Sequence, residues 1–173
     1  DETLKVVENS CSGAWLTPEQ TLQSLAAGHT AFRGGGASLL SSSAALDALA
    51  GCEVVVKHEN TQPTGAFKVR GGLALAATLT PAHLAAGLVT ASTGNHAQSI
   101  AYAARLHGAT ATIVVPESAP EAKVAAVRLL GANVVVHGPT MTEAVAKAQE
   151  LAGRDGMTYV DPGNTPAIIA GHA

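Results

Sequence analysis

Charged side chains are scarce in this sequence. Only 13% of the 173 residues are Asp, Glu, Lys or Arg, and the formal net charge is −3. A nucleic-acid-binding domain normally carries a basic surface, which this charge balance does not provide. Aromatic residues make up only 3%, which also argues against platforms for stacking bases. The composition therefore predicts no nucleic-acid partner.

Cysteine is rare as well. Cys11 and Cys52 are the only two, and no two of the seven histidines lie within five residues of each other. This spacing excludes a local zinc motif and a disulfide scaffold, so we expect no metal site and a reducing, cytoplasmic location. No apolar run approaches the length of a membrane span, and no signal-peptide pattern opens the chain. We therefore expect no membrane partner.

What remains is typical of a compact α/β protein, with 47% hydrophobic residues and 18 glycines. From residue 52 onward, short β-branched runs alternate with longer Ala-rich segments of helical periodicity. The predicted strands are residues 52–59, 87–92, 110–116, 133–138 and 157–161. The predicted helices are residues 67–79, 96–108, 120–132 and 142–153, with others starting at Thr80-Pro81 and after Thr17-Pro18.

The predicted strands are too apolar to face water on one side. They indicate a parallel sheet with helices on both faces, which is a three-layer α/β fold. On the helix over 96–108, we expect the face formed by Ala97, Ile100, Ala101 and Ala104 to be buried. Gly108 and Gly131 are expected helix ends, and the spacing of Thr140 and Glu143 predicts a capping box.

The segment "STGN" joins a predicted strand to a predicted helix, the place where open parallel sheets bind ligands. Ser92, Thr93 and Asn95 offer polar groups there, and Gly94 lets a ligand approach the backbone. The helix dipole favours an anion at this point. The same residues would also serve as an ordinary helix cap, and His96 would then be only a surface polar group.

The segment "TGAFKVRGG" places Lys68 at the expected start of a helix, between Phe67 and Val69. The helix dipole, the apolar neighbours and the charge of Arg70 all favour a neutral amine, which can attack a carbonyl. An ordinary surface lysine is the alternative. The Gly-rich run from Arg33 to Ser38 is not flanked by a clear strand and helix, so it predicts a linker rather than a phosphate site.

Two longer stretches, "KHENTQPTGAFKVRGG" and "ASTGNHAQSIAYAARLHG", resemble the pyridoxal-phosphate enzymes of the threonine/serine dehydratase family, which includes serine racemases. The likeness continues through "TIVVPESAPEAKVAAVRLLGANVVVHG" and "TYVDPGNTPAIIAG", so it covers residues 53–173. It implies a fold-type-II α/β enzyme that uses pyridoxal 5'-phosphate. The implied reaction is β-elimination from a hydroxy amino acid, such as L-threonine or L-serine, to a 2-oxo acid and ammonia.

The resemblance also implies roles for individual residues. Lys68 would hold the cofactor as a Schiff base and, once released, would take the Cα proton of the substrate. Phe67 would pack near the pyridine ring, and Asn95 would hydrogen-bond the cofactor's 3-hydroxyl. The substrate carboxylate would be held by Ser92, Thr93, Gly94, Asn95 and His96, in the loop that the pattern already marks for an anion.

By the same resemblance, residues 1–74 are expected to belong to a large domain and residues 75–157 to a small mobile domain. Residues 158–173 would return into the large domain. Family members are longer, so we expect an N-terminal fragment of an enzyme that is a homo-oligomer at full length. The alternatives are a serine racemase or hydroxyaspartate dehydratase of the same family, and an inactive fragment or small non-enzymatic module.

Overall fold

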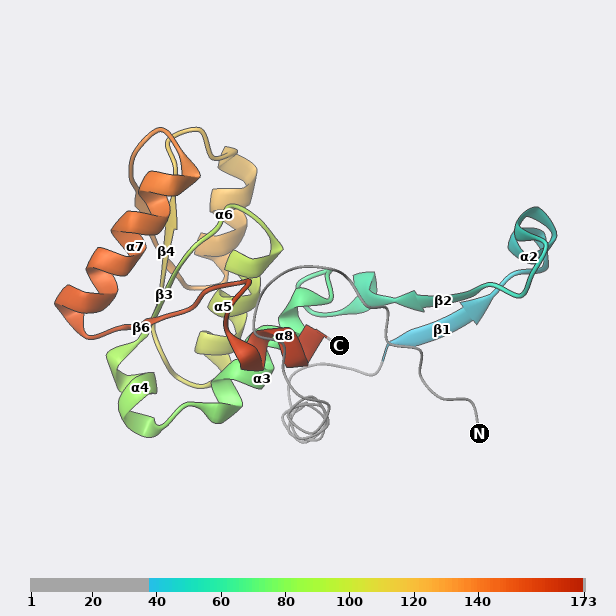
Figure 1. Ribbon diagram of the computed structural model, residues 1–173, viewed down its shortest axis with the longest axis horizontal. Helices are drawn as coiled ribbons and strands as arrows, with labels where there is room; N and C mark the ends of the chain where they lie inside the picture. Colours follow the sequence, from blue (N-terminus) through green and yellow to red (C-terminus); the bar gives the residue numbers. More distant parts are fainter. Residues whose placement is uncertain (1–37, 173) are drawn as a thin grey trace.

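The structure is a computed structural model that describes residues 38–172 (Figure 1). The helix expected after Thr17-Pro18 and the run Gly34-Gly35-Gly36 lie outside these residues. The body is built on a sheet of four parallel strands in the order β5-β4-β3-β6. The strands are β3 (Leu88–Ala91), β4 (Ala111–Val115), β5 (Asn133–Val136) and β6 (Thr158–Tyr159). The predicted parallel sheet is therefore confirmed.

Helices cover both faces of this sheet. The helices of the body are α3 (Lys68–Thr78), α4 (Pro81–Ala86), α5 (Asn95–Leu106), α6 (Glu121–Leu129), α7 (Met141–Asp155) and α8 (Pro166–His172), of which α5, α6 and α7 pack directly on the strands. Successive strand residues point to opposite faces. One face packs on α5 and α6, through a core that includes Leu88, Ile113, Val115, Ala97 and Val127. The other packs on α7, through Val89, Ala91, Val114, Ala144 and Ala148. The result is the expected three-layer arrangement (Figure 1).

Local sequence signals set the ends of these helices as predicted. Thr80 caps α4 by accepting a hydrogen bond from the His83 amide, and Thr140 and Glu143 form the capping box of α7. Gly108 and Gly131 have φ values of 67° and 88°, a left-handed conformation that suits glycine after a helix. The predicted inward face of α5 is buried in full.

The strand predicted over residues 52–59 is not part of the parallel sheet. It forms β2 (Val55–His58), which pairs antiparallel with β1 (Leu39–Ser42) in a separate two-stranded ribbon. The ribbon projects from the body, carries α2 (Ala44–Ala50) at its tip, and leads through the short η1 (Glu59–Thr61) into α3 (Figure 1). Its valines made β2 look like a buried strand, but Val55 is 57% exposed. The prediction of a buried, parallel strand here was wrong.

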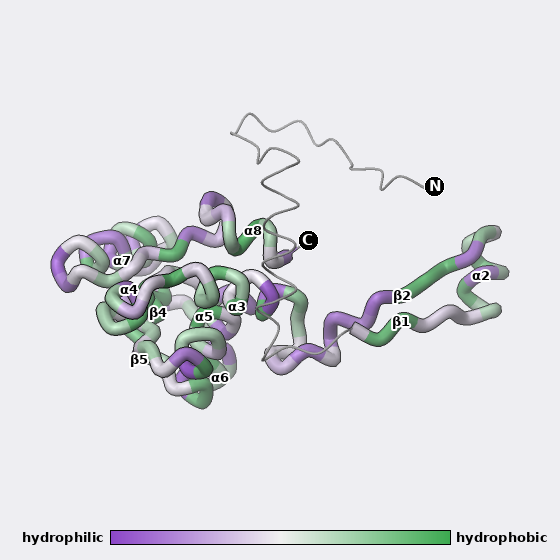
Figure 2. Tube along the Cα trace, turned by 90° about the horizontal axis from the view of Figure 1, so that it is seen from below, coloured by the Kyte–Doolittle hydropathy of each residue, from purple (hydrophilic) through white to green (hydrophobic). Residues whose placement is uncertain are grey.

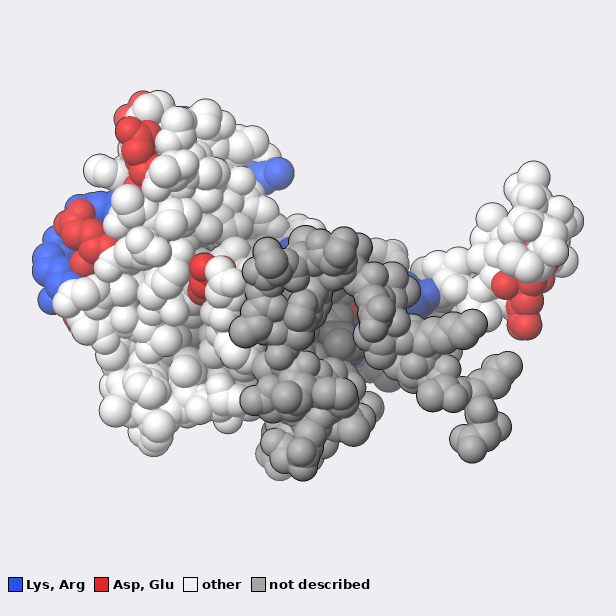
Figure 3. All heavy atoms as spheres, in the orientation of Figure 1, with Lys and Arg blue, Asp and Glu red and all other residues white. Residues whose placement is uncertain are grey.

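The surface of the body and of the ribbon differ in character. Apolar residues follow the ribbon, where Leu39, Leu40 and Leu49 are all exposed (Figure 2). Charged residues gather over α7, where Lys147 pairs with Glu150 and Arg154 with Asp155 (Figure 3). Such exposed pairs contribute little to stability. Within residues 38–172, no helix combines the length and the apolar character that crossing a membrane requires.

Candidate active site

The loop between β3 and α5 lies at the carboxyl ends of the central strands. The Ser92 amide donates to the Val114 carbonyl at 3.2 Å, and the Ser92 hydroxyl accepts from the Gly94 amide at 3.2 Å. Gly94 is the N-cap residue of α5 and supplies no side-chain cap. A Cβ atom built on Gly94 would meet nothing within 4 Å among residues 38–172, which leave space beside this glycine. The first amides of a helix have no partner within the helix, which suits an anion here.

Lys68 is the first residue of α3, and Phe67 is its N-cap residue. Its side chain is half-buried, and the residues Ala66 and Val69 are buried. The Nζ atom of Lys68 lies 5.3 Å from the centroid of the Phe67 ring, within the range of a cation–π contact. The amine of Lys68 thus lies near an aromatic ring that is itself 42% exposed.

Close packing of α3 on α5 brings Lys68 towards the loop. The Ser99 hydroxyl, one turn into α5, donates to the backbone carbonyl of Lys68 at 2.5 Å. A Cβ atom on Gly72 would lie 2.7 Å from the Ser99 carbonyl oxygen, so only glycine permits this approach. The two helices therefore present their N-terminal ends, Lys68 on one and Asn95-His96 on the other, as neighbours.

His96 is buried, with an exposed fraction of 4%. Neither ring nitrogen makes a hydrogen bond of normal geometry within the described residues. Burial, followed by the charges of Lys68 and His172, lowers the pKa of His96 from its ordinary 6.5 to about 4. The alternative that His96 is a surface group is wrong. It is a buried imidazole that is neutral near pH 7 and lies close enough to Lys68 for the lysine charge to affect its pKa.

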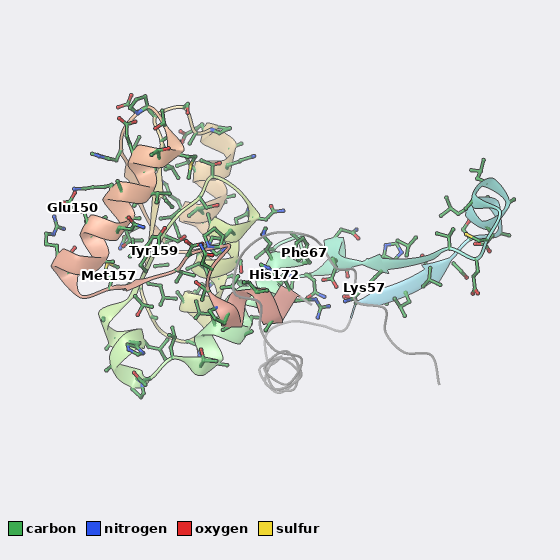
Figure 4. The ribbon with its side chains drawn as sticks, viewed as in Figure 1. Lys57, Phe67, Glu150, Met157, Tyr159 and His172 are labelled. Carbon is green, nitrogen blue, oxygen red and sulfur yellow. The ribbon has the colours of Figure 1, made fainter. Side chains whose placement is uncertain are left out.

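Sequence reasoning missed His172, which closes α8 and lies beside Phe67 (Figure 4). The two ring centroids are 5.1 Å apart with an interplanar angle of 79°, an edge-to-face contact. His172 also lies close enough for Lys68 to affect its pKa. No local signal in "IIAGHA" points to this contact, because it joins segments far apart in the chain.

A second missed group anchors the start of α3. Glu59 pairs with Arg70 at 2.8 Å and accepts a hydrogen bond from the Ser38 hydroxyl at 2.6 Å, and Arg70 also donates to Ser38. Burial acts to raise the pKa of Glu59, but the hydrogen bonds from Arg70, Ser38 and Lys57 lower it to about 2. This network ties the base of the ribbon to the helix that begins with Lys68.

The loop after β6 adds an anionic group near His96. Asp161 accepts hydrogen bonds from the amides of Gly163 at 2.7 Å and Asn164 at 3.0 Å. Burial opposes the shift, but these hydrogen bonds hold the pKa of Asp161 below its usual value. The charge of Asp161 in turn favours the protonated form of His96. The turn sequence "DPGN" signals the loop, although not its proximity to His96.

The residues present fit the carbonyl end of an aldehyde cofactor bound beside an anion. Lys68 offers an amine at the start of a helix, and His96 offers a buried imidazole whose ring nitrogens make no hydrogen bond of normal geometry within residues 38–172. Gly94 leaves open space at the start of α5. Fold and site together are those of an α/β enzyme domain that presents a lysine amine beside a loop suited to an anion.

The comparison with protein families agrees with this description. The family model described as "Pyridoxal-phosphate dependent enzyme" matches residues 32–173, and the chain belongs to this family. The cofactor of the family is pyridoxal phosphate.

Two curated proteins are similar to this chain over 70% or more of its length. The biosynthetic L-threonine dehydratase IlvA of Pasteurella multocida is 46% identical over 121 residues, which are 70% of this chain and 24% of that protein. The L-threonine ammonia-lyase of Thermotoga maritima is 42% identical over 132 residues, which are 76% of this chain and 33% of that protein. The chain thus spans about a quarter to a third of the length of these relatives.

Solved structures show the same fold. The processed form of threonine deaminase isoform 2 from Solanum lycopersicum matches with a TM-score of 0.84 and 32% identity, over 96% of this chain and 49% of that one. The serine racemase of maize matches with a TM-score of 0.83 and 29% identity, over 86% of this chain and 46% of that one. The predicted fold-type-II class is therefore confirmed.

Proposed function

We propose that the full-length protein containing this chain eliminates water from a hydroxy amino acid such as L-threonine or L-serine, and that hydrolysis of the resulting enamine then gives a 2-oxo acid and ammonia. The observation that carries the proposal is the juxtaposition of Lys68 with the helix end that bears His96. The similarity to proteins named as threonine dehydratases supports it. When bound, pyridoxal phosphate supplies an electron sink for the negative charge that develops at the substrate Cα.

The residues of this chain have distinct tasks in the proposal. Lys68 would hold the cofactor through Nζ, and the same nitrogen would take the Cα proton of the substrate. Phe67 packs beside the cofactor ring, and Asn95 hydrogen-bonds its 3-hydroxyl. The β-hydroxyl leaves as water, and the enamine that results hydrolyses to the 2-oxo acid and ammonia.

The substrate carboxylate is assigned to the start of α5. Ser92, Thr93, Gly94, Asn95 and His96 surround this helix end, whose dipole favours an anion. The half-buried state of Ser92, Thr93 and Gly94 leaves them partly accessible to a small molecule. Because His96 is neutral near pH 7, it serves as a hydrogen-bonding group rather than as a counter-charge.

Absorption spectroscopy and product analysis test the proposal together. The full-length protein should show the visible band of lysine-bound cofactor, and Lys68→Ala should abolish it. Lys123→Ala, which removes an exposed lysine from α6, is the matched control and should leave the band unchanged. A band that survives in Lys68→Ala would overturn the assignment of the lysine.

A second candidate is amino-acid racemisation, favoured by the close structural match to serine racemase. L-Serine, L-threonine and 3-hydroxyaspartate distinguish the outcomes. A 2-oxo acid from the first two supports the proposal, D-serine without a 2-oxo acid supports racemisation, and product from 3-hydroxyaspartate alone supports the corresponding dehydratase. Absence of cofactor binding by the full-length protein would instead favour a non-enzymatic module.

We also propose a domain organisation, an oligomeric state and a location for the full-length protein. Residues 75–157, which hold most of the parallel sheet, are assigned to a small mobile domain, and residues 1–74 and 158–173 to a large one. The exposed apolar residues of the ribbon suit burial in a homo-oligomer. A cytoplasmic location accords with the scarcity of cysteine. Sedimentation of the full-length protein and fluorescence imaging of a tagged copy test the last two points.

A further inference from the structure

His172 contributes to the site although it lies far from Lys68 in sequence. Helix α8 packs on α3 through glycines from both: a Cβ atom on Gly171 would lie 2.7 Å from the Arg70 carbonyl oxygen. A Cβ atom on Gly71 would lie 2.5 Å from Nε2 of His172. The backbone of α3 therefore approaches the imidazole directly, and the position of the ring is fixed by contact with that helix.

Among the described residues, the ring of His172 packs edge-to-face against the ring of Phe67. The edge-to-face geometry at 5.1 Å restrains the Phe67 ring, and the same ring lies 5.3 Å from Nζ of Lys68. Phe67 is thus held on one side by an imidazole and in turn holds the lysine amine. Figure 4 shows Phe67 and His172 together where α3, α8 and the base of the ribbon meet.

The charge state of His172 permits this arrangement. Burial, followed by the charge of Lys68, lowers the pKa of His172, so the ring is neutral near pH 7 and does not repel the lysine. His96, the other imidazole facing Lys68, is neutral as well. Nε2 of His172 is buried without a hydrogen-bond partner in the described part of the chain.

We propose that His172 is a positioning residue for Lys68, acting through Phe67 to fix the direction of the lysine amine. The inference rests on the proposed function, because it gives a purpose to the orientation of Lys68. In this role, the His172 ring acts through its contact with Phe67 and transfers no proton.

Kinetics of the full-length protein provide the first test. Misplacing a catalytic group by a small distance is costly, so His172→Ala should lower kcat on the order of tenfold. The KM for the amino acid should stay within about twofold, because the carboxylate is assigned to the start of α5. His172→Phe, which keeps an aromatic edge against Phe67, should restore most of kcat, whereas His172→Gln should not. His107→Ala removes an exposed histidine at the end of α5 and is the matched control.

A measurement without turnover provides the second test. In the cofactor-free full-length protein labelled with 13C at lysine Cε, the Lys68 signal should be displaced by the ring current of Phe67. This displacement should fall by at least half in His172→Ala and persist in His172→Phe. An unchanged Lys68 signal in His172→Ala, an unchanged kcat, a raised KM as the main effect, or no rescue by His172→Phe would each overturn the inference.

The two proposals fail separately. If Lys68→Ala keeps the cofactor band, the function assigned to the lysine is wrong, and with it the purpose given to His172. If the band depends on Lys68 but His172→Ala behaves as wild type in both tests, only the positioning role is wrong.

Discussion

The hydroxyl of Ser99 donates a hydrogen bond of 2.5 Å to the backbone carbonyl of Lys68. This bond joins the first residue of α3 to the buried side of α5, beside the close approach of the two helices at Gly72. The lysine is therefore located through its backbone as well as through its side chain.

Removing this bond should weaken the protein modestly. Ser99→Ala should lower the free energy of unfolding by about 1 kcal/mol, the net value of a typical hydrogen bond. Ser99→Val should cost more, about 1–3 kcal/mol, because the larger side chain has no room against Gly72. Urea unfolding of the full-length protein measures both. Ser118→Ala, at an exposed loop position, should change little, and an equal loss there would contradict the assignment.

A pair of glycines tests the helix contact itself. Gly72→Ala should destabilise by about 1–3 kcal/mol, since the new Cβ atom meets the Ser99 backbone. Gly153→Ala is the control: it lies within α7, and its Cβ atom would meet nothing within 4 Å. It should stabilise by about 0.5–1 kcal/mol through helix propensity. The midpoint temperature of thermal unfolding should fall in Gly72→Ala and rise in Gly153→Ala. Shifts of the same sign would show that close packing at Gly72 is unimportant.

The buried imidazole of His96 should make stability depend on acidity. The unfolded chain takes up this proton near pH 6.5, whereas the folded chain takes it up only near pH 4. Between these values the unfolded state binds more protons, so stability falls as pH drops from 6.5 towards 4. The contribution is up to roughly 3 kcal/mol.

His96→Gln should flatten the unfolding free energy across that window, whereas His83→Gln, at an exposed position on α4, should not. An imidazole that titrates near 6.5 by NMR in the folded protein would refute the expected shift.

The ion pair and hydrogen bonds of Glu59 should affect the stability of the protein at a lower pH than His96 does. Because the pKa of Glu59 is about 2 in the folded protein and 4.5 ordinarily, its stabilising effect is full above 4.5 and is lost as pH falls towards 2. Glu59→Gln should lower the free energy of unfolding at pH 7 by roughly 1–3 kcal/mol, because the ion pair between Glu59 and Arg70 is lost. Unfolding curves at pH 7 and pH 3 measure this. Glu121→Gln removes an exposed ion pair with Arg128 and should have little effect at either pH.

The parallel sheet could be predicted because its signals are local. β-Branched runs, the cap at Thr80 and the glycines at 108 and 131 each act within a few residues. The loop before His96 was found for the same reason, since a strand, polar residues and a helix follow one another directly. The placement of β2 could not be predicted from local signals, because it pairs with the Ser-rich β1, which lies elsewhere in the sequence.

The surroundings of Lys68 were predicted only in part. Its position at a helix start and beside Phe67 followed from the sequence. The contact of His172 with Phe67 and the charge effect of Asp161 on His96 did not, because they depend on where α8 and the last strand return. Contacts between residues that are far apart in the chain cannot be detected from the spacing of residues in the sequence.

The contact between Gly72 and Ser99 also limits how the site can open. Gly72 and Ser99 belong to the two different domains proposed above, so their contact would lie at the domain interface. A movement of the small domain that separated Lys68 from the loop at Gly94 would have to break the Ser99 hydrogen bond and open a gap beside Gly72. The cost of losing this contact would therefore oppose opening of the site.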